Sequence, residues 1–271
     1  MEIELEHEQQ KILANKNSIW DLIRNEAEQI ALRKQEIKKF LKSTILKHKS
    51  LESSLAWRLA SKLCSPEISN KRLYELALSS YKKKNILVEN ACLDIIAVKE
   101  RDPACSRYLE PLLYFKGFQA IQAYRLSNYL YKLDNCDLAF FLQMRMSEVF
   151  GVDIHPNASI GNSIMIDHAH SIVIGETAIV GNNVSMLHSV TLGGTGKEKG
   201  LRHPKIGDGV LLGAGASVLG NISVGRCSKV ASGSVVLSNV PEFKTVAGIP
   251  ARVVGTSGCD QPSSEMDHNL N

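Results

Sequence analysis

The chain has 271 residues, of which 44% are hydrophobic and 22% are charged, and its net charge is +4. This composition is typical of a folded globular protein and excludes a disordered chain, while the length allows one large or two modest domains. Basic residues are interleaved with acids, as in "RKQEIKKFLK". We interpret them as solvated helix faces and expect no nucleic-acid partner.

Three further features limit where the protein works. No stretch approaches the ~18 uninterrupted apolar residues of a membrane span, so we expect no membrane partner. The first residues, "MEIELEHEQQK", are too acidic for a secretory signal or a transit peptide. The six cysteines are scattered without a CxxC pair. We therefore expect free thiols in a cytoplasmic protein, with neither disulfides nor a zinc site.

Residues 1–145 have the apolar spacing of helices. Leu51, Leu55, Leu59 and Leu63 step by four and line one helix face. The interpretation is an all-helical domain.

Several helix boundaries can be placed by their local chemistry. Ser65-Pro66-Glu67 has the order of an N-cap, a first-turn proline and an early acid, which predicts a helix start. A helix through "NACLDIIAVKERD" should stop before Pro103, because proline disfavours α geometry in the residue before it. Glu110-Pro111 predicts the start of another helix, and Asp137 the start of a third.

From Ile154 onward the apolar period changes to six. The aliphatic positions keep three successive phases, which are Ile154, Ile160, Ile166 and Ile172, then Ile174, Val180, Met186 and Leu192, then Ile206, Leu212, Val218, Val224, Val230 and Val236. Glycine often follows directly. Hexapeptide repeats are a signature of β-helices, in which short strands are joined by tight turns and each coil stacks on the next.

The predicted fold class is therefore α+β. The expected domains are a helical N-terminal domain over residues 1–145, a parallel β-helix over 146–255 and a flexible C-terminal tail over 256–271. One excursion loop over 193–205, "GGTGKEKGLRHPK", breaks the repeat. A purely structural solenoid would have no reason to break its repeat there, so we expect the loop to carry function.

Specific motifs in both halves resemble one family. They are "STILKH" at 43–48, "RDPA" at 101–104, "PLLYFKGFQAIQAYR" at 111–125, "VDIHPNASIG" at 152–161, "DHA" at 167–169, "VTLGGTGK" at 190–197, "RHPKIGDGVLLGAGASVLGNISVG" at 202–225 and "AGIPARVVG" at 247–255. The sequence resembles the serine O-acetyltransferases, which acetylate L-serine in cysteine biosynthesis. The resemblance implies a left-handed β-helix, trimers through the β-helix and hexamers through the helical domains.

The implied reaction needs a base, because the serine hydroxyl must lose its proton as it attacks the acetyl-CoA thioester. Histidine suits this role, and a carboxylate on its other nitrogen would fix its tautomer. The family pattern places these roles on His168 and Asp153, which are a little under one coil apart. We expect that separation to bring the two side chains together on adjacent layers. The resemblance implies direct attack without an acyl-enzyme.

The amino-acid substrate needs partners for its carboxylate and its ammonium. The resemblance assigns these tasks to Arg202, His203, Asp102 and Asp167. An arginine fork suits a carboxylate, and the two aspartates suit an ammonium. Because Asp102 belongs to the helical half, the site is expected where the two domains meet.

Acetyl-CoA is the expected cosubstrate, and no metal is expected. By resemblance, glycines and small residues let the pantetheine arm approach the β-helix closely. The candidates for CoA binding are Gly194, Thr195, Ala214 and Lys229.

Two alternative functions stay open at this point. One is a hexapeptide acetyltransferase for another small acceptor, which the helical half argues against. The other is a β-helix carbonic anhydrase, whose zinc would need three histidines and whose HxxxxH pair is absent here.

The resemblance also implies partners beyond the substrates. L-cysteine is the expected feedback inhibitor, because it resembles serine and could use Arg202, Asp102 and Asp167. O-acetylserine sulfhydrylase binds the isoleucine-terminated tail of many family members, whereas this sequence ends in "SSEMDHNLN". We expect binding of that enzyme to be weak or absent.

Overall fold

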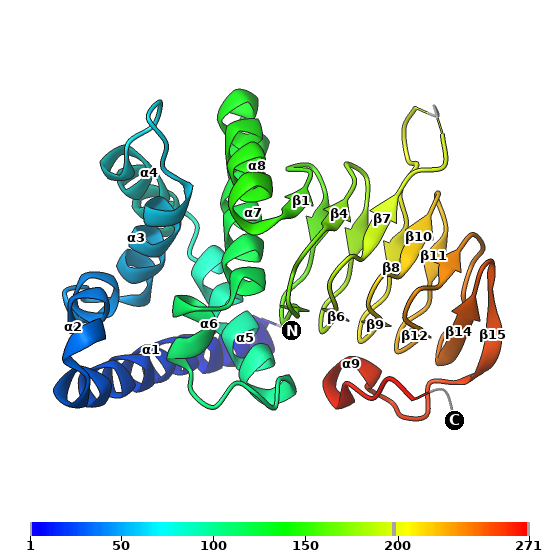
Figure 1. The fold of residues 1–271 in the computed structure, drawn as a ribbon, viewed down its shortest axis with the longest axis horizontal. Helices are drawn as coiled ribbons and strands as arrows, with labels where there is room; N and C mark the ends of the chain where they lie inside the picture. The colour runs from blue at the N-terminus through cyan, green and yellow to red at the C-terminus, as the bar shows by residue number, and fades with distance from the viewer. Residues whose placement is uncertain (1, 197–198, 270–271) are drawn as a thin grey trace.

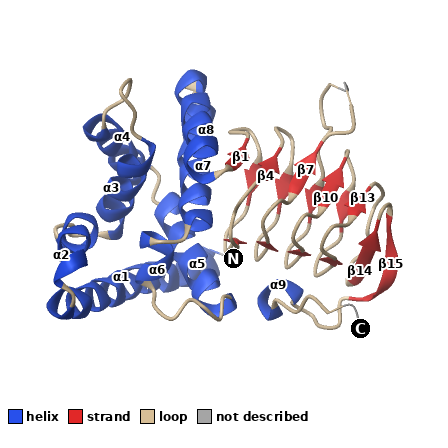
Figure 2. Cartoon of the chain, in the orientation of Figure 1, coloured by secondary structure: helices blue, strands red, loops and turns tan. Residues whose placement is uncertain are grey.

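The structure is a computed structural model that describes residues 2–196 and 199–269. A helical half is followed by a three-sided solenoid of short strands (Figures 1 and 2). The helices of the first half are α1 (Glu2–Arg33), α2 (Gln35–Leu41), a π-helical turn η1 (Lys42–Leu46), α3 (Leu51–Leu63), α4 (Asn70–Lys83), α5 (Ile86–Arg101), α6 (Leu109–Leu113), α7 (Lys116–Lys132) and α8 (Cys136–Phe150). No helix of the described ranges is long and apolar enough to cross a membrane.

The predicted helix start at Ser65-Pro66-Glu67 is wrong. α4 begins at Asn70, and the hydroxyl of its N-cap Ser69 accepts the N–H of Arg72. Ser65 instead closes a turn, because its hydroxyl accepts the N–H of Glu67 at 3.3 Å. A side chain that bonds its own neighbours competes with helix formation at that position.

The next boundaries follow the sequence more closely. α5 ends at Arg101, ahead of Pro103 as predicted. The segment expected as one helix from Glu110 is divided into α6 and α7 around Tyr114 and Phe115. α8 runs past residue 145 to Phe150 and ends at Gly151, whose φ of 68° is the left-handed conformation that glycine adopts most easily.

The β-helix has three parallel faces. Sheet A contains β1 (Val152–Ile154), β4 (Ile172–Ile174), β7 (Thr191–Gly193), β10 (Ser217–Leu219) and β13 (Val235–Val236). Sheet B contains β2 (Ser159–Ile160), β5 (Ile179–Val180), β8 (Lys205–Ile206) and β11 (Ser223–Val224). Sheet C contains β3 (Met165–Ile166), β6 (Ser185–Met186), β9 (Leu211–Leu212), β12 (Lys229–Val230), β14 (Lys244–Gly248) and β15 (Ala251–Thr256). The predicted parallel β-helix is confirmed.

The three sheets meet along three edges, which we name AB, BC and CA after the sheets that each joins. The hexapeptide aliphatic residues point inward and are buried, apart from the half-buried Ile160. They form one apolar core that continues into the helical half. Alternation of inward and outward side chains along each strand explains this burial.

The coils differ in length, and the differences fall at two corners. Asp153 pairs with Val173, 20 residues on, and the extra two residues lie in the CA corner of residues 167–171. Ile179 pairs with Lys205, 26 residues on, because the excursion loop intervenes at the AB edge. Residues 197 and 198 of this loop lie outside the described residues. Both departures from the regular repeat coincide with candidate site residues.

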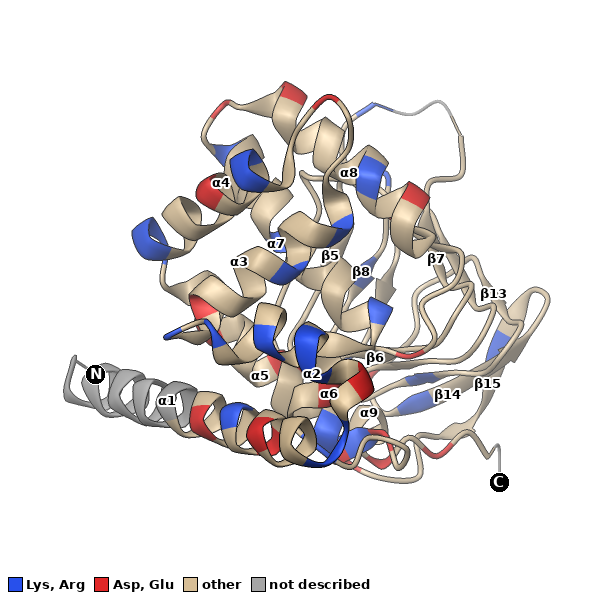
Figure 3. Ribbon diagram, turned by 60° about the vertical axis from the view of Figure 1, so that its left-hand side comes forward, with Lys and Arg blue, Asp and Glu red and all other residues tan. Residues whose placement is uncertain are grey.

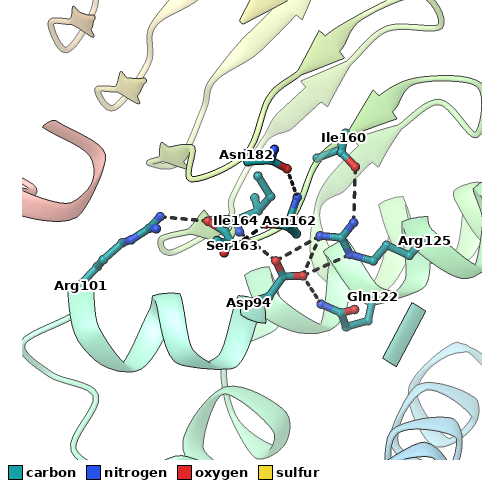
Figure 4. Close-up of polar contacts among 9 residues, drawn as sticks. All are labelled: Asp94, Arg101, Gln122, Arg125, Ile160, Asn162, Ser163, Ile164 and Asn182. Atoms are coloured by element: carbon teal, nitrogen blue, oxygen red, sulfur yellow. Dashed lines mark hydrogen bonds and ion pairs between the residues drawn. The ribbon is translucent and has the colours of Figure 1, made fainter. Parts of the chain in front are cut away.

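The helical half is fixed to the first coil by buried polar groups (Figure 4). The Asp94 carboxylate of α5 accepts hydrogen bonds from the Arg125 guanidinium of α7 at 2.8 Å and from the backbone N–H of Ile164 at 2.8 Å. Asp94 is 0% and Arg125 4% exposed. Arg101 donates to the carbonyl of Ser163 at 3.0 Å. Because α5 also ends at Asp102, these bonds fix the position of Asp102 against the β-helix.

The segment after β15 was expected to be a flexible tail, and within the described residues it packs on the protein instead. It contains the short helix α9 (Pro262–Glu265), which lies beside the β-helix in Figure 1. Ser185 donates to the carbonyl of Ser263 at 2.8 Å, and Met266 packs against Val98, Cys105 and Met165. The apolar Met266 side chain and the paired backbone explain why the segment docks.

Charged residues do not gather on one face. In Figure 3 acidic and basic positions alternate along the described part of α1, where Arg24 pairs with Glu28. This distribution agrees with the reading of the basic residues as solvated helix faces.

Candidate active site

The CA corner carries His168 on a constrained backbone. His168, Ala169 and Ser171 have φ values of 57°, 53° and 56°, in the left-handed region that few residues other than glycine occupy. The two residues by which this coil exceeds the next make such a corner possible. The corner directs the His168 side chain outward, where it is 67% exposed. Strained backbone of this kind is common at functional sites.

A cavity of about 330 Å³ lies between this corner and the helical half. Its charged lining is Asp102, Lys116, Asp167 and His168. The remaining lining residues are Val98, Ala104, Tyr114, Phe115, Gly117, Met165 and Ile166. The structure therefore brings together three of the predicted residues, from two domains, around a space suited to a small molecule.

Local sequence explains how Asp102 reaches this cavity. Pro103 ends α5, and the Asp102 carboxylate accepts the N–H of Ala104 at 2.8 Å. Gly117 allows α7 to lie directly on β3, because a Cβ at this position would be 2.0 Å from the Ile166 carbonyl oxygen. The close contact places the start of α7, with Lys116, at the cavity.

Lys116 joins the helical half to the CA corner. Its Nζ lies 2.8 Å from Nδ1 of His170, and burial lowers the pKa of Lys116. Since an ammonium can only donate, His170 Nδ1 is the acceptor. His170 is thereby held beside the cavity, whereas His168 stays free to face it.

His168 has two close neighbours in the structure. Its Nε2 lies 3.5 Å from the Asp167 carboxylate, and its ring meets that of His188 edge to face with centroids 5.8 Å apart. Ile166 pairs with Met186, so His188 is the residue one coil below His168. Nδ1 of His188 is buried without a hydrogen-bond partner.

The AB corner holds the other substrate candidates, Arg202 and His203. The Arg202 guanidinium donates to Glu176 at 2.6 Å, and this bond lowers the pKa of the Glu176 carboxyl. The His203 ring contacts Thr177 and is 8% exposed. Burial is the main cause of the lowered pKa of His203, and the neighbouring Arg202 charge lowers it further.

Asp153 lies on the outer face of sheet A and does not contact His168 in the described structure. It pairs with Val173, and His168 lies five residues before Val173 in the corner. The expectation that their near-coil spacing stacks these side chains is therefore wrong. Gln143 of α8 donates to Asp153 at 2.6 Å. The Asp153 charge raises the pKa of His155, although burial has the larger effect and lowers it.

The four CoA candidates occupy three different places. Ala214 is half-buried on the CA edge, one coil below His188, since Met186 pairs with Leu212. Gly194 and Thr195 are exposed at the AB edge. Lys229 is 4% exposed on sheet C, and its Nζ donates to the carbonyl of Asn269 at 3.1 Å and lies 3.6 Å from Asp267.

The predicted site is thus divided between two edges of one chain. Asp102, Asp167 and His168 share the CA side, whereas Arg202 and His203 occupy the AB corner. Sequence reasoning missed Lys116, Glu176 and Thr177. The phase step from Val180 to Ile206 carries the signal for two of them, because the same step of 26 residues relates Glu176 to Arg202 and Thr177 to His203.

Comparison with known proteins identifies the family. Residues 19–123 match the family described as "Serine acetyltransferase, N-terminal", and residues 203–238 match "Bacterial transferase hexapeptide (six repeats)". The serine acetyltransferase of Escherichia coli strain K12 is 49% identical over 253 residues, which cover 93% of each chain. The chain belongs to the serine acetyltransferase family.

Solved serine acetyltransferases have the same fold. One in complex with cysteine matches with a TM-score of 0.92 at 46% identity and covers 94% of this chain and 99% of its own. The enzyme of Brucella abortus in complex with coenzyme A matches at 0.88 and 50% identity, covering 89% and 97%. The soybean enzyme complexed with serine matches at 0.87 and 50% identity, covering 89% and 99%.

A search for metal ligands covers the rival zinc chemistry. Within residues 2–196 and 199–269, no three His, Cys, Asp or Glu side chains are grouped so that they could hold a metal ion. All six cysteines are free.

Proposed function

We infer that this protein is a serine O-acetyltransferase, which transfers the acetyl group of acetyl-CoA to the hydroxyl of L-serine and releases O-acetyl-L-serine and CoA. Family membership at 49% identity over 93% of the chain carries this conclusion. The cavity at the CA corner supports it, because it places an outward imidazole and two carboxylates around a space for a small amino acid.

The residues of the CA corner suit the first half of the reaction. Asp102 and Asp167 bind the serine ammonium and so hold the hydroxyl near His168. His168 takes the hydroxyl proton as the oxygen attacks the thioester carbon. The tetrahedral intermediate collapses with cleavage of the carbon–sulfur bond, and the imidazolium returns the proton to the CoA sulfur. Asp153 stabilises the imidazolium if an assembly or closure brings it to His168.

The CA edge is the proposed path for CoA. Below His168 the stacked corner positions are His188, Ala214 and Ser232, so small residues follow the two imidazoles. A pantetheine arm along this line would place the thioester beside His168. Gly194 and Thr195 would contact CoA from the excursion loop, and Lys229 could do so after release of Asn269.

We propose that the site is completed between two copies of the chain. One small amino acid must reach Arg202 and His168 together, yet these residues occupy different edges of one prism. A head-to-tail contact of the AB edge of one copy with the CA edge of the next satisfies both and closes as a trimer. Exposed apolar side chains on two faces, Val173 and Ile179, suit such a contact. Pairing of trimers through the helical domains would give a hexamer.

Mixed assemblies test the shared site. His168→Ala and Arg202→Ala are each expected to be inactive alone. Coexpressed, they should regain up to about a quarter of wild-type activity, because some interfaces then combine two intact halves. Sites complete within one chain would regain none.

Two further proposals follow from the same site. L-cysteine should compete with L-serine, because it offers the same ammonium and carboxylate; a family structure in complex with cysteine supports this. A cytoplasmic location is supported by six free cysteines, which persist in reducing compartments.

The deciding experiment measures CoA release from acetyl-CoA with purified protein. Release that depends on L-serine, with O-acetylserine as product, is expected. Release with sugars but without L-serine response would keep the fold and overturn the substrate. No release with any acceptor would overturn the reaction, and a zinc-dependent hydration assay would then test the carbonic anhydrase alternative.

A further inference from the structure

The corner of residues 175–177 surrounds His203 with an unusually complete set of bonds. Thr177 lies directly one coil above His203, because Ile179 pairs with Lys205 in the 26-residue coil. The Thr177 hydroxyl accepts the N–H of Arg202 at 3.1 Å and the N–H of His203 at 3.2 Å. It also lies 2.9 Å from Nδ1 of the His203 ring.

These contacts decide which ring nitrogen carries the proton. A hydroxyl has two acceptor lone pairs and one proton, and here both lone pairs are occupied by backbone N–H groups. Its proton is therefore left for Nδ1 of His203. The N–H of Thr177 donates to the same nitrogen at 3.2 Å. Nδ1 accepts two hydrogen bonds, so the proton of the neutral ring must be on Nε2.

The opposite side of the ring is open for a ligand. No residue of the described chain forms a hydrogen bond with Nε2, and Nε2 is not among the buried atoms that lack a partner. The ring lies flat over Gly175, where a Cβ would come within 2.1 Å of Nε2. A Cβ on Gly194 would be 3.8 Å from Nε2. Two glycines therefore leave the Nε2 side clear.

Glu176, between these two residues, fixes the neighbouring cation. Its carboxylate accepts from the Arg202 guanidinium at 2.6 Å, and Arg202 also donates to the Gly200 carbonyl at 3.3 Å. Three consecutive residues thus act on one pair of side chains. Gly175 gives the ring room, Glu176 orients the guanidinium, and Thr177 fixes the ring.

We propose that Thr177 is a positioning residue for the acetyl transfer, which holds His203 as a neutral ring that donates only through Nε2. In this role His203 donates a fixed hydrogen bond to bound L-serine and does not take up or release protons. Burial and the Arg202 charge both lower the pKa of His203, in agreement with a neutral ring. The proposal rests on the assignment of His203 to the substrate site.

The wild-type protein allows a direct test without substitution at Thr177. Nitrogen NMR of protein labelled at histidine separates protonated from unprotonated ring nitrogens, and His203→Asn identifies the signal. We expect an unprotonated Nδ1 and a protonated Nε2 for His203 at neutral pH. A protonated Nδ1 would overturn the proposal.

Kinetics of two variants test the consequence. Thr177→Val removes the hydroxyl and leaves two backbone N–H groups without an acceptor, so KM for L-serine should rise at least about tenfold. KM for acetyl-CoA should stay within about twofold, and Thr177→Ser should restore KM for L-serine to within about threefold, because the bonds require only the hydroxyl. Equal impairment of both variants, or of neither, contradicts the role of the hydroxyl.

A matched control separates positioning from stability. Thr245→Val also removes a buried threonine hydroxyl, which donates to the Thr256 carbonyl at 2.7 Å in the β14–β15 hairpin. It should lower the melting temperature without a change in KM for L-serine. If His203→Asn itself leaves serine kinetics unchanged, the substrate role of His203 fails, whereas the NMR result still decides its tautomer.

Discussion

The two corners that hold functional side chains are constructed in opposite ways. At the AB corner, Arg202 and His203 are fixed by hydrogen bonds from Glu176 and Thr177 one coil away. At the CA corner, His168 projects from a left-handed turn and is 67% exposed, with a 3.5 Å approach to Asp167 as its polar contact. One corner is preorganised within the chain, whereas the other leaves its reactive imidazole to be oriented by substrate or by a second copy.

This difference suits the separate tasks of the two corners. Groups that recognise a substrate gain from being fixed in advance, because no ordering cost remains when the substrate binds. A base must face both the hydroxyl and the leaving sulfur during one reaction, and an outward imidazole can reach both. The following predictions test whether the division holds.

The largest effect is expected at His168. His168→Ala should lower kcat by about 10²–10⁴-fold, because the general base is lost, with little change in the melting temperature of an exposed position. His170→Ala, in the same corner, is the matched control and should retain kcat within a few-fold. Steady-state kinetics with L-serine checks both. A full effect at His170 instead would move the base one turn along the corner.

The second effect concerns stability. Asp94→Ala leaves the buried Arg125 charge unpaired, so the free energy of unfolding should fall by about 3–5 kcal/mol. Denaturant titration measures this loss. Because Asp94 and Asp102 share α5, the variant should also raise KM for L-serine. Unchanged stability would show that the two halves dock without this ion pair.

Two glycine substitutions compare the corners directly. In Gly117→Ala the new Cβ would meet the Ile166 backbone oxygen at 2.0 Å, so α7 must move from β3 and stability should fall by about 1–3 kcal/mol. In Gly175→Ala the Cβ would meet the His203 ring at 2.1 Å. A side chain yields more easily than backbone, so this variant should lose serine affinity with less loss of stability. Thermal melts and KM values for both variants decide, and the reverse ranking would contradict the assigned contacts.

The hexapeptide period made most of the β-helix predictable from sequence. The spacing of Ile154, Val180 or Leu212 depends on local chain geometry, because every inward residue stacks on its equivalent one coil away. Asp102 was predictable in the same way, since Pro103 ends its helix. Ser65 misled the analysis because its hydroxyl forms a turn of its own.

The separation of the two corners could not be read from motif spacing. His168 and Asp153 are near one coil apart in number, but the corner is two residues longer than the regular repeat and turns His168 away from the stack. Whether Arg202 reaches His168 depends on contacts between copies, for which the period of one chain contains no information. Thr177 and Glu176 were within reach, because the phase of the repeat aligns them with His203 and Arg202.

The smallest expected effect is a dependence of stability on pH. Burial lowers the pKa of His48, His155 and His203 below the ordinary value near 6.5. The unfolded chain therefore binds more protons than the native protein just below that pH, so the native state loses stability as pH falls from about 6.5 toward the lowered pKa values. Above about 6.5 this contribution is fully present. Denaturant titrations at pH 7.5, 6.5 and 5.5 should show a decrease that His203→Asn makes shallower. An equal decrease in His203→Asn would mean that the ring in the AB corner contributes nothing to it, and that His48 and His155 account for the whole dependence.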